Sequence, residues 1–480
     1  MIADLKPYQK YKESGSRWLS AVPAHWEVRN LRTLLTKRTE RNRADLPLLS
    51  VAREKGVFVR SLTDENENHN FIPEDLTNYK VARAGNLVIN KMKAWQGSMG
   101  IAPCDGIVSP AYFVFDFRIS NHGFGQALLR SKPYVAHFGQ ASDGVRVGQW
   151  DLSIPGMRQI PILVPPKDEQ DAIVRFLSHA NYRIQKAIQA KHRIIALLNE
   201  QQQAIIHQAL SRGFVEHLPV NILCLPKEVR TAPGWQSFSV RRLIQLRLLA
   251  IQDGNHGELH PKASDYVDDG IPFLMANNVR PEGLDLSGCA KLHETHARTL
   301  RIGFAHAGDV LLTHKATIGQ IGRVPEDLKA PFVMLTPQVT YYRTTGTKIL
   351  GDYLFHYMQS PLFQKQLKML SLNQSTRPYV GVIEQKNLII CFPSLENQQR
   401  ICAEIRSSIA PVEAARSRIE REVDLLIEYR ARLVADVVTG KLDVREAVAN
   451  LPEETPTEAK ALHSGDAPDE TKLVDEEAAA

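Results

Sequence analysis

The stretch PPKDEQDAIVRFL at residues 165–177 is answered in pattern by PSLENQQRICAEI at residues 393–405. The likeness runs on without a gap from ALLNEQQQAIIHQAL (196–210) to DLLIEYRARLVADVV (424–438), at a constant offset of 228 residues. Apolar residues recur every three or four positions along both stretches, which is typical of an amphipathic helix. A long helix that is written twice predicts two copies of one plan.

The apolar seam of each predicted helix carries the same irregularity. Its steps alternate between four and three residues, except for a repeated step of four at 187–191–195 and again at 415–419–423. A shared stutter of this kind lets two helices match each other along a coiled coil. The seam also holds the polar residues Lys191, Gln202 and Arg430, which can set the register or face a partner.

Two residues predict a break within each helical segment. Pro411 suits the first turn of a helix, and Asn181 in the corresponding region of the first copy is a good N-cap. We therefore expect a short helix and then a long one, starting near residues 182 and 411. Packed antiparallel, the long helices would form a spacer bar of about 43 Å at 1.5 Å per residue. A plain helical hairpin without a spacer role is the alternative.

The remaining sequence divides into two globular blocks, residues 16–164 and 214–392, whose motifs recur in the same order. GNLVINKMKAWQGSMG starting at Gly85 is answered by GDVLLTHKATIGQIG starting at Gly308. Short apolar runs bounded by Gly, Pro, Asn and Asp predict strands, and Pro361 interrupts a predicted helix. Each block is expected to be a small mixed α/β domain.

The fold class predicted from these patterns is α/β, with two duplicated mixed α/β domains and two long antiparallel coiled-coil helices. Trp26 and Trp235 occupy matching positions and are expected to pack in the domain cores. The expected boundaries are a first domain at 1–165, a helical spacer at 166–213, a second domain at 214–392, a second spacer at 393–444, and an acidic, disordered tail at 445–480.

Composition places the 480-residue chain among ordinary globular proteins of two to four domains, with 43% hydrophobic and 23% charged residues. No apolar run approaches the roughly 18 residues that a membrane span needs, and the first residues show no secretory signal. The five cysteines are scattered and never spaced as CxxC, which favours a reducing cytosol over a disulfide frame or a thiolate zinc site. We expect a cytoplasmic protein.

The charge is unevenly distributed. Residues 451–480 carry nine acidic residues against two lysines, a net of −7, which leaves +13 on residues 1–450 out of the total of +6. A basic body indicates a polyanion as partner, while a merely soluble basic protein is the alternative. The sequence lacks a phosphate-binding loop and a metal-ligand spacing such as HExxH. The absence of these motifs favours a binding module over an enzyme.

Specific motifs add a family resemblance. SRWLSAVPAHWEV and IVSPAYFVF in the first half, APGW, ENQQRI and VVTGKL in the second, and the repeated helical stretches occur in a fixed order. Over about residues 16–444 this order resembles the specificity subunit of type I restriction–modification systems. The chain departs from the family at Asn397, where the usual Glu of the EQ pair is replaced; the first copy keeps the pair as Glu169 and Gln170.

The resemblance implies a DNA-reading subunit without catalytic activity of its own. Each block would be a target recognition domain for one half of a bipartite, asymmetric site. The paired helices would fix the spacer and dock two modification subunits that methylate adenine, and restriction and translocation subunits would complete the complex. The chain itself would hold no cofactor, because S-adenosylmethionine, ATP and Mg belong to the partner subunits. The alternatives are a coiled-coil scaffold that binds no DNA and a fused methyltransferase or nuclease.

Polar residues in turns after predicted strands are the candidates for DNA contact. Cations there can neutralise phosphates, and amide side chains can pair with adenine edges. For each residue the alternative is a solvated turn. The candidates are Arg53, Lys55, Lys91, Lys93, Trp95, Gln96, Ser98 and Arg146 in the first block, and Asn255, His256, Asn277, Asn278, Lys315, Thr317, Gln320 and Arg377 in the second.

A second set of residues is assigned to partner subunits. Glu169, Gln170 and Gln398 start the two helical segments, where they either cap the helices or meet a modification subunit. Lys191, Gln202 and Arg430 join this set because they are polar residues on the apolar seam.

Overall fold

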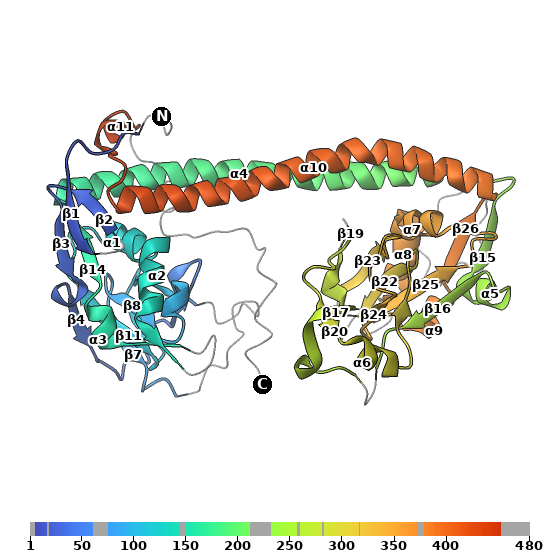
Figure 1. Ribbon diagram of the computed structural model, residues 1–480, viewed down its shortest axis with the longest axis horizontal. Coiled ribbons are helices and arrows are strands. Elements are labelled where there is room, and N and C mark those ends of the chain that lie inside the picture. The colour runs from blue at the N-terminus through green and yellow to red at the C-terminus, as the bar shows by residue number, and fades with distance from the viewer. Residues whose placement is uncertain are drawn as a thin grey trace. The chain divides into compact units, whose positions relative to one another are not determined.

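A computed structural model describes residues 5–16, 19–60, 75–144, 150–211, 232–256, 260–280, 283–315, 317–371 and 379–452. They form two compact units of mixed α/β structure (Figure 1), which confirms the predicted fold class. Unit 1 comprises residues 1–193 and 419–480, and unit 2 comprises residues 194–418. The division falls inside both long helices, so each unit contains a part of each of them.

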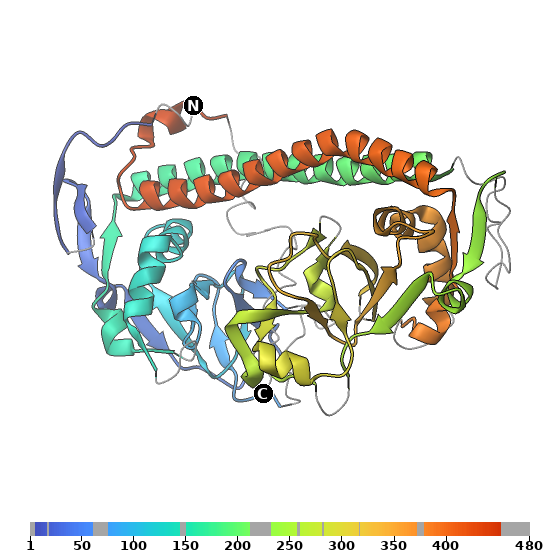
Figure 2. The same cartoon turned by 45° about the vertical axis from the view of Figure 1, so that its right-hand side comes forward.

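The two long helices are α4 (Lys167–Ser211) and α10 (Leu395–Val438). With 45 and 44 residues they are about 68 and 66 Å long. They lie side by side (Figures 1 and 2) and are antiparallel, because contact positions rise along α4 as they fall along α10. The hydrogen bonds that show this join Gln185 to Arg430 and Lys191 to Glu422 in unit 1, and Asn199 to Arg416 in unit 2.

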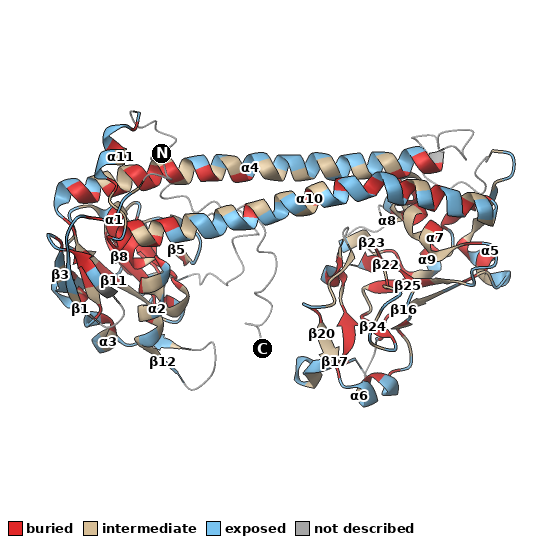
Figure 3. Ribbon diagram, turned by 45° about the horizontal axis from the view of Figure 1, so that its top comes forward, coloured by how far each residue is buried: buried red, intermediate tan, exposed pale blue. Residues whose placement is uncertain are grey.

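The predicted seam is the packed face of both helices. Every seam position of α4 is buried or half-buried, and the same holds for α10 except at Ser408. There Ser408 is exposed and the neighbouring Ile409 is buried in its place. Figure 3 shows buried and exposed residues alternating along both helices. The antiparallel coiled coil expected from the stutter is thus confirmed.

The predicted breaks near residues 182 and 411 are wrong, because both helices continue through these positions. Pro411 lies within α10 on its exposed side. A proline at this position removes one backbone hydrogen bond, but the freed carbonyl faces solvent. Ile409 and Val412 on either side are buried against the rest of the protein and hold the helix in register. Tertiary packing therefore outweighs the local preference of proline.

Unit 1 is built on a four-stranded antiparallel sheet with two short helices against it. Trp26 is fully buried in its core together with Phe115 and Phe124, which confirms the prediction for this tryptophan. The sheet order is β4 (Leu35–Arg38), β11 (Tyr112–Phe117), β8 (Leu87–Asn90) and β9 (Met99–Ile101), and the helices are α1 (His122–Leu129) and α2 (Lys132–Gln140).

Short elements surround this sheet. One antiparallel pair, β3 (Glu27–Asn30) with β14 (Pro161–Val164), leads directly into α4. The others are the pairs β1 (Tyr11–Ser16) with β2 (Leu19–Pro23), β5 (Leu49–Ala52) with β6 (Gly56–Val59), β7 (Lys80–Ala82) with β10 (Gly106–Val108) and β12 (Ser142–Asp143) with β13 (Asp151–Leu152), and helix α3 (Ile154–Arg158).

Unit 2 repeats this plan. Its sheet has the order β16 (Leu249–Asp253), β25 (Val339–Thr344), β22 (Val310–Lys315) and β23 (Thr317–Arg323), followed by α7 (Gly351–Gln359) and α8 (Pro361–Ser371). The pair β15 (Gln236–Ser239) with β26 (Ile389–Phe392) leads into α10 as β3 and β14 lead into α4. Helices α7 and α8 meet at Pro361, where the sequence predicts the interruption. Trp235 is only half-buried, packed at the edge of the core.

Further elements surround the first sheet of unit 2. They are a second sheet of β20 (Ala290–Leu292), β17 (Tyr266–Leu274), β24 (Val333–Leu335) and β21 (Phe304–Ala305), the pair β18 (Val279–Arg280) with β19 (Gly283–Leu284), and helices α5 (Val240–Gln245), α6 (Glu294–Thr299) and α9 (Val382–Gln385). The strands β17 and β24 are parallel, unlike every other named pair of strands in the described residues.

The beginning of the predicted disordered tail is ordered. Residues 445–449 form α11 (Arg445–Ala449), and Val444, Val448 and Leu451 are buried in the core of unit 1. The prediction is therefore wrong for residues 445–452, because three apolar residues spaced for one helical face pack against the unit. The remainder of the tail lies outside the described residues.

Candidate nucleic-acid interface

The turn after β8 holds most of the candidates of unit 1. Lys91 and Lys93 follow the strand, and Gln96 closes the 3-10 helix η2 (Ala94–Gln96). Lys91 Nζ lies 2.7 Å from the carboxylate of Asp151, and its side chain is 34% exposed. Lys93 is exposed and Gln96 is half-buried. The turn therefore presents two cations, one of them already shared with an acid.

Aromatic packing gives this turn its shape. The rings of Trp95 and Trp150 lie 5.2 Å apart, and Trp95 Nε1 donates a hydrogen bond of 3.1 Å to the carbonyl of Met92. Met92 itself is 51% exposed, whereas Ser98 is only 2% exposed. Trp95 is thus a support of the turn, and the hydroxyl of Ser98 lies inside the unit, away from any ligand at the surface.

The hairpin between β5 and β6 carries the other two candidates of unit 1. The Arg53 side chain is 68% exposed, and its backbone carbonyl accepts a 2.7 Å hydrogen bond from Arg130. The Lys55 ammonium lies 5.3 Å from the ring centroid of Phe58. Burial lowers the pKa of the Arg130 guanidinium, which is held beneath the turn by backbone carbonyls. Arg53 and Lys55 therefore stand on a braced turn.

Unit 2 contains a cavity of about 330 Å³ at one end of its first sheet. Asp253 ends β16 and Lys315 ends β22, which brings two residues 62 positions apart to the same end of the sheet. Tyr379 reaches the wall through an isolated β-bridge with Lys315. His256, which is exposed, and Pro337 complete the lining.

A polar network behind the cavity fixes Asp253. Asp253 Oδ1 accepts a 2.8 Å hydrogen bond from Thr340, whose hydroxyl in turn accepts one of 3.1 Å from Gln385. His314 Nε2 lies 3.4 Å from the same oxygen, and the His314 ring is 5.5 Å from that of Tyr379. Burial lowers the pKa of His314, against the pull of Asp253. His314 is therefore a neutral, fully buried group directly behind the wall.

The other candidates of unit 2 divide by exposure. Asn255 is 2% and Asn278 5% exposed, and Asn278 Oδ1 accepts from the backbone of Met275 at 2.9 Å, so both side chains serve the fold. Asn277 and Thr317 are exposed, and Gln320 is half-buried. Arg146 and Arg377, one in each unit, lie outside the described residues.

The chain is similar to known proteins in sequence and in structure. The chain is 20% identical over 196 residues to the type I restriction enzyme EcoBI specificity subunit of Escherichia coli, a match that covers 41% of this chain and 40% of that protein. The chain therefore matches less than half the length of this relative. No protein-family model matches the chain.

Two solved structures are also similar. A chain from "Structural basis underlying complex assembly and conformational transition of the type I R-M system" has a TM-score of 0.54 at 14% identity, over 88% of this chain and 99% of that one. The HsdS subunit from Thermoanaerobacter tengcongensis has a TM-score of 0.38 at 17% identity, over 88% and 98%. The first of these supports a shared fold; the second is too distant to add to it. The chain is thus similar in sequence to a type I specificity subunit and in fold to a chain of a type I R-M system.

The three residues that start the long helices are internal in this fold. Gln170 and Gln398 are fully buried, and Glu169 is 5% exposed. Gln170 Oε1 accepts from the backbone of Asn121, and Gln398 Oε1 accepts from that of Leu350, both at 2.9 Å. Each glutamine thus ties a long helix to the N-cap of the short helix α1 or α7. Of the two predicted roles, only the structural one is seen.

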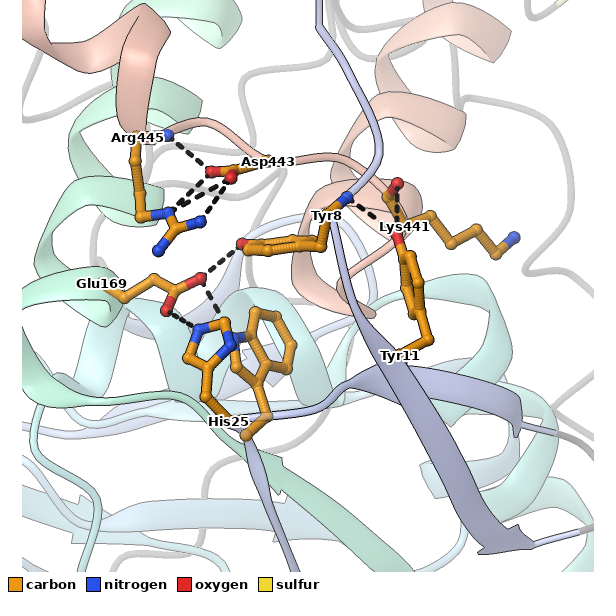
Figure 4. A network of polar contacts seen from close by, with 8 residues as sticks. Tyr8, Tyr11, His25, Glu169, Lys441, Asp443 and Arg445 are labelled. Carbon is orange, nitrogen blue, oxygen red and sulfur yellow. Dashed lines mark hydrogen bonds and ion pairs between the residues drawn. The ribbon is translucent and has the colours of Figure 1, made fainter.

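Glu169 lies at the centre of a buried network (Figure 4). Its carboxylate accepts hydrogen bonds from the hydroxyl of Tyr8 and, at 3.0 Å, from Nε1 of Trp26, and it pairs with His25 at 2.7 Å. Burial and the adjacent carboxylate raise the pKa of Tyr8. The pair Asp443–Arg445 lies beside this network (Figure 4), and the Arg445 guanidinium covers the Tyr8 ring at 5.2 Å. The network joins both ends of the described chain to the long helix α4.

The predicted seam contacts to partners lie between the long helices. Lys191 pairs with Glu422 at 2.5 Å, and Arg430 donates to Gln185 at 3.2 Å. Burial lowers the pKa of Arg430. Gln202 is half-buried. Lys191 and Arg430 thus join the two helices, and contact with a partner stays a prediction for all three residues.

Sequence reasoning missed Asp253 and Tyr379, which line the cavity. The stretch that contains Asp253, DGNHG, has the composition of a tight turn, and Tyr379 follows a segment without a strand pattern. Asp253 could have been recognised as a candidate site residue, because it is a carboxylate at the end of a strand in a basic protein. Among the described residues no cluster of His, Cys, Asp or Glu could hold a metal ion, and no described helix is long and apolar enough to cross a membrane.

Proposed function

We propose that this chain is the DNA sequence-specificity subunit of a type I restriction–modification complex. Each unit reads one half of a bipartite, asymmetric DNA target. The observation that carries the proposal is the pair of sheets with the same strand order, β4-β11-β8-β9 and β16-β25-β22-β23, which hold different polar turns at matching positions. A duplicated scaffold with divergent surfaces suits two readers of different sequences.

The exposed cations of these turns supply the affinity in this proposal. Lys93 is exposed beside a strand end of unit 1, and Arg53 and Lys55 are exposed on the hairpin between β5 and β6. Such cations displace the counterions that surround DNA phosphates, so binding should weaken steeply as salt rises. Base contacts then come from the polar groups between the cations.

The paired helices set the spacer between the half-sites and dock two modification subunits. Two leucines support the docking. Leu197 on α4 and Leu425 on α10 are equivalent at the offset of 228 residues, and they are 55% and 63% exposed. We assign them to the docking surfaces because they are large, apolar and exposed at equivalent positions of the two helices. One leucine lies in each unit, as two identical partners require.

In this proposal the chain itself performs no reaction. S-adenosylmethionine is held by the modification subunits, which methylate adenine, and ATP and Mg by the restriction and translocase subunits. A fused methyltransferase or nuclease would instead act alone, so incubating the purified chain with S-adenosylmethionine and duplex DNA separates the two ideas. Methylation by the isolated chain would contradict the proposal.

The decisive experiment maps methylated adenines in a host that expresses the chain with its modification subunit. We expect one bipartite motif, and exchange of residues 16–164 for the first block of another specificity subunit should change one half of it only. A change in both halves, or in neither, contradicts the assignment of one unit to each half. A coiled-coil scaffold without DNA binding would give no motif and no salt-dependent binding to duplex DNA.

Two further variants test the helices. Insertion of one heptad into both α4 and α10 should lengthen the unread spacer and leave both halves unchanged. An unchanged spacer would refute the proposal that the helices set its length. Leu197→Asp and Leu425→Asp should each weaken binding of one modification subunit, measured by native mass spectrometry of the complex. Glu200→Asp, on the exposed side of α4, is the matched control.

A further inference from the structure

The cavity of unit 2 is built from residues that carry opposite charges. Asp253 and Lys315 end two strands that flank β25 on either side, and the register explains their proximity. Thr340 on β25 is opposite Asp253 on one side and Leu312 on the other, so Lys315 lies three positions further along β22. The two side chains therefore share the wall of one recess of about 330 Å³.

The wall offers both an acceptor and a donor. Asp253 Oδ1 is occupied by Thr340 and faces His314, but no hydrogen bond among the described residues reaches Oδ2. The Lys315 ammonium likewise has no partner within the described part of the chain, and its side chain is exposed. Tyr379 and His256 add a hydroxyl and an imidazole to the rim. A carboxylate only accepts and an ammonium only donates.

This combination is unsuited to phosphate and suited to a base edge. A phosphate oxygen would meet the charge of Asp253, which costs electrostatic energy at short range. A base pair is neutral and shows donors and acceptors next to each other in the major groove. The fixed position of Asp253 matters here, because Thr340, itself held by Gln385, binds the carboxylate before any ligand arrives.

We propose that this cavity reads a G·C base pair in the half-site of unit 2, with Asp253 accepting from the cytosine N4 amino group and Lys315 donating to guanine O6 and N7. The inference rests on the function proposed above. These are the pairings that the two side chains favour. Adenine is read best by an amide, which donates and accepts at once, and among the described residues no Asn or Gln lines the cavity.

The test uses Asp253→Asn in the complex of the full chain with its modification subunits. Asparagine keeps an oxygen for Thr340 but adds a donor, so it should also accept an adenine edge. We expect one C·G position in the unit 2 half of the methylated motif to relax to include A·T. Discrimination there should fall on the order of tenfold or more. The other half and the spacer should keep their sequence and length.

Two more variants keep the result decisive. Asp269→Asn changes an exposed carboxylate of unit 2 outside the cavity and should leave the motif unaltered. Lys315→Met removes the donor from an exposed side chain and should relax the same or the adjacent position, even if Asp253→Asn impairs folding. If both cavity variants keep every position of the motif as strict as the unaltered chain, the inference is overturned. Relaxation in the half read by unit 1 would overturn it too.

Failure of the proposed function would look different. In that case the unaltered complex would show no bipartite motif at all, before any cavity variant is made. Salt dependence separates a base reader from a phosphate contact: Asp253→Asn should leave the slope of affinity against salt unchanged for a non-cognate duplex. A slope that changes by about one would make the cavity an electrostatic site and refute the reading of a base pair.

Discussion

Units 1 and 2 start their long helices in the same way and then diverge by one residue. Gln170 and Gln398 are buried at equivalent positions and make equivalent backbone hydrogen bonds. The residue before them is Glu169 in unit 1 and Asn397 in unit 2. The Glu169 carboxylate binds Tyr8, His25 and Trp26, whereas Asn397 is half-buried and its side chain makes no hydrogen bond to the described residues. The glutamine therefore belongs to the shared scaffold, and the glutamate to the closure of unit 1 alone.

The candidate nucleic-acid surfaces of the two units diverge at another equivalent pair. The alignment of Gly85 with Gly308 sets Lys91 beside His314, and strand registers agree, since Leu87 pairs with Phe115 as Val310 pairs with Tyr342. Lys91 is partly exposed and pairs with Asp151, while His314 is buried behind Asp253. The same position thus holds a surface cation in unit 1 and a buried neutral imidazole in unit 2.

The largest expected difference between the units comes from Glu169→Ala. The change strands the buried hydroxyl of Tyr8 and the indole N–H of Trp26, each worth about 1–3 kcal/mol when left unpaired, so unit 1 should lose about 4 kcal/mol of unfolding free energy. Hydrogen exchange of peptides from each unit measures this. Asn397→Ala is the matched control and should cost unit 2 under about 0.5 kcal/mol. Equal losses in both units would contradict the asymmetry.

The glutamines should behave alike where the glutamate does not. Gln170→Ala and Gln398→Ala each leave a partly buried backbone N–H and a buried carbonyl without their partner. We expect a loss of about 3 kcal/mol in the unit that contains each residue. Urea titration followed by hydrogen exchange reports the two units separately. If only one variant were destabilised, the two helix starts would not be structural equivalents.

Acid should weaken unit 2 more than unit 1. Burial lowers the pKa of His356 from 6.5 to about 4, and Ala127 lies at the same distance from the N-cap of α1 as His356 does from the N-cap of α7. Between these values the unfolded chain takes up a proton that the folded unit refuses, so stability is full above pH 6.5 and falls as the pH drops toward 4. The loss from pH 7 to pH 5 should be about 2 kcal/mol.

The control for this prediction copies unit 1. His356→Ala removes the titrating group, so the difference in unit 2 stability between pH 7 and pH 5 should shrink, whatever the absolute cost of the cavity. Thermal unfolding at both pH values, with hydrogen exchange to assign the unit, gives the comparison. An unchanged pH dependence would show that other groups carry it.

The duplicated scaffold is readable from the sequence because its signals are local and periodic. The seam of apolar residues, the stutter and the ordered motifs predict the antiparallel helices and both sheets. The predicted break at Pro411 fails because burial of Ile409 and Val412 decides the matter. A prediction from local sequence takes account of the proline. It cannot take account of the rest of the protein, against which the helix packs.

The site is less readable because its neighbours are distant in sequence. Glu169 looks like a surface residue of a first helical turn, and only Tyr8 and His25, more than 140 positions earlier, reveal that it is buried. Asp253 meets Lys315 only through the pairing of both strands with β25. The sequence did predict that Lys93, Lys315 and Asn277 are exposed, because polar turns lie at the surface in most folds.

The smallest expected effect tests whether the Lys91 position differs in role between the units. Lys91→Ala should weaken binding to every duplex alike and reduce the slope of log affinity against log salt by about one, since one phosphate contact is lost. Lys91→His, which copies unit 2, should do the same at pH 8, where an imidazole is neutral.

Asp151→Asn frees the lysine and should strengthen binding at low salt. The loss of an ion pair at this exposure costs at most about 1 kcal/mol of stability. If Lys91→Ala and Asp151→Asn leave the slope where it was, the pair only links β13 to the turn. A change of base preference would instead make Lys91 a reader, and the two units would then differ less than His314 suggests.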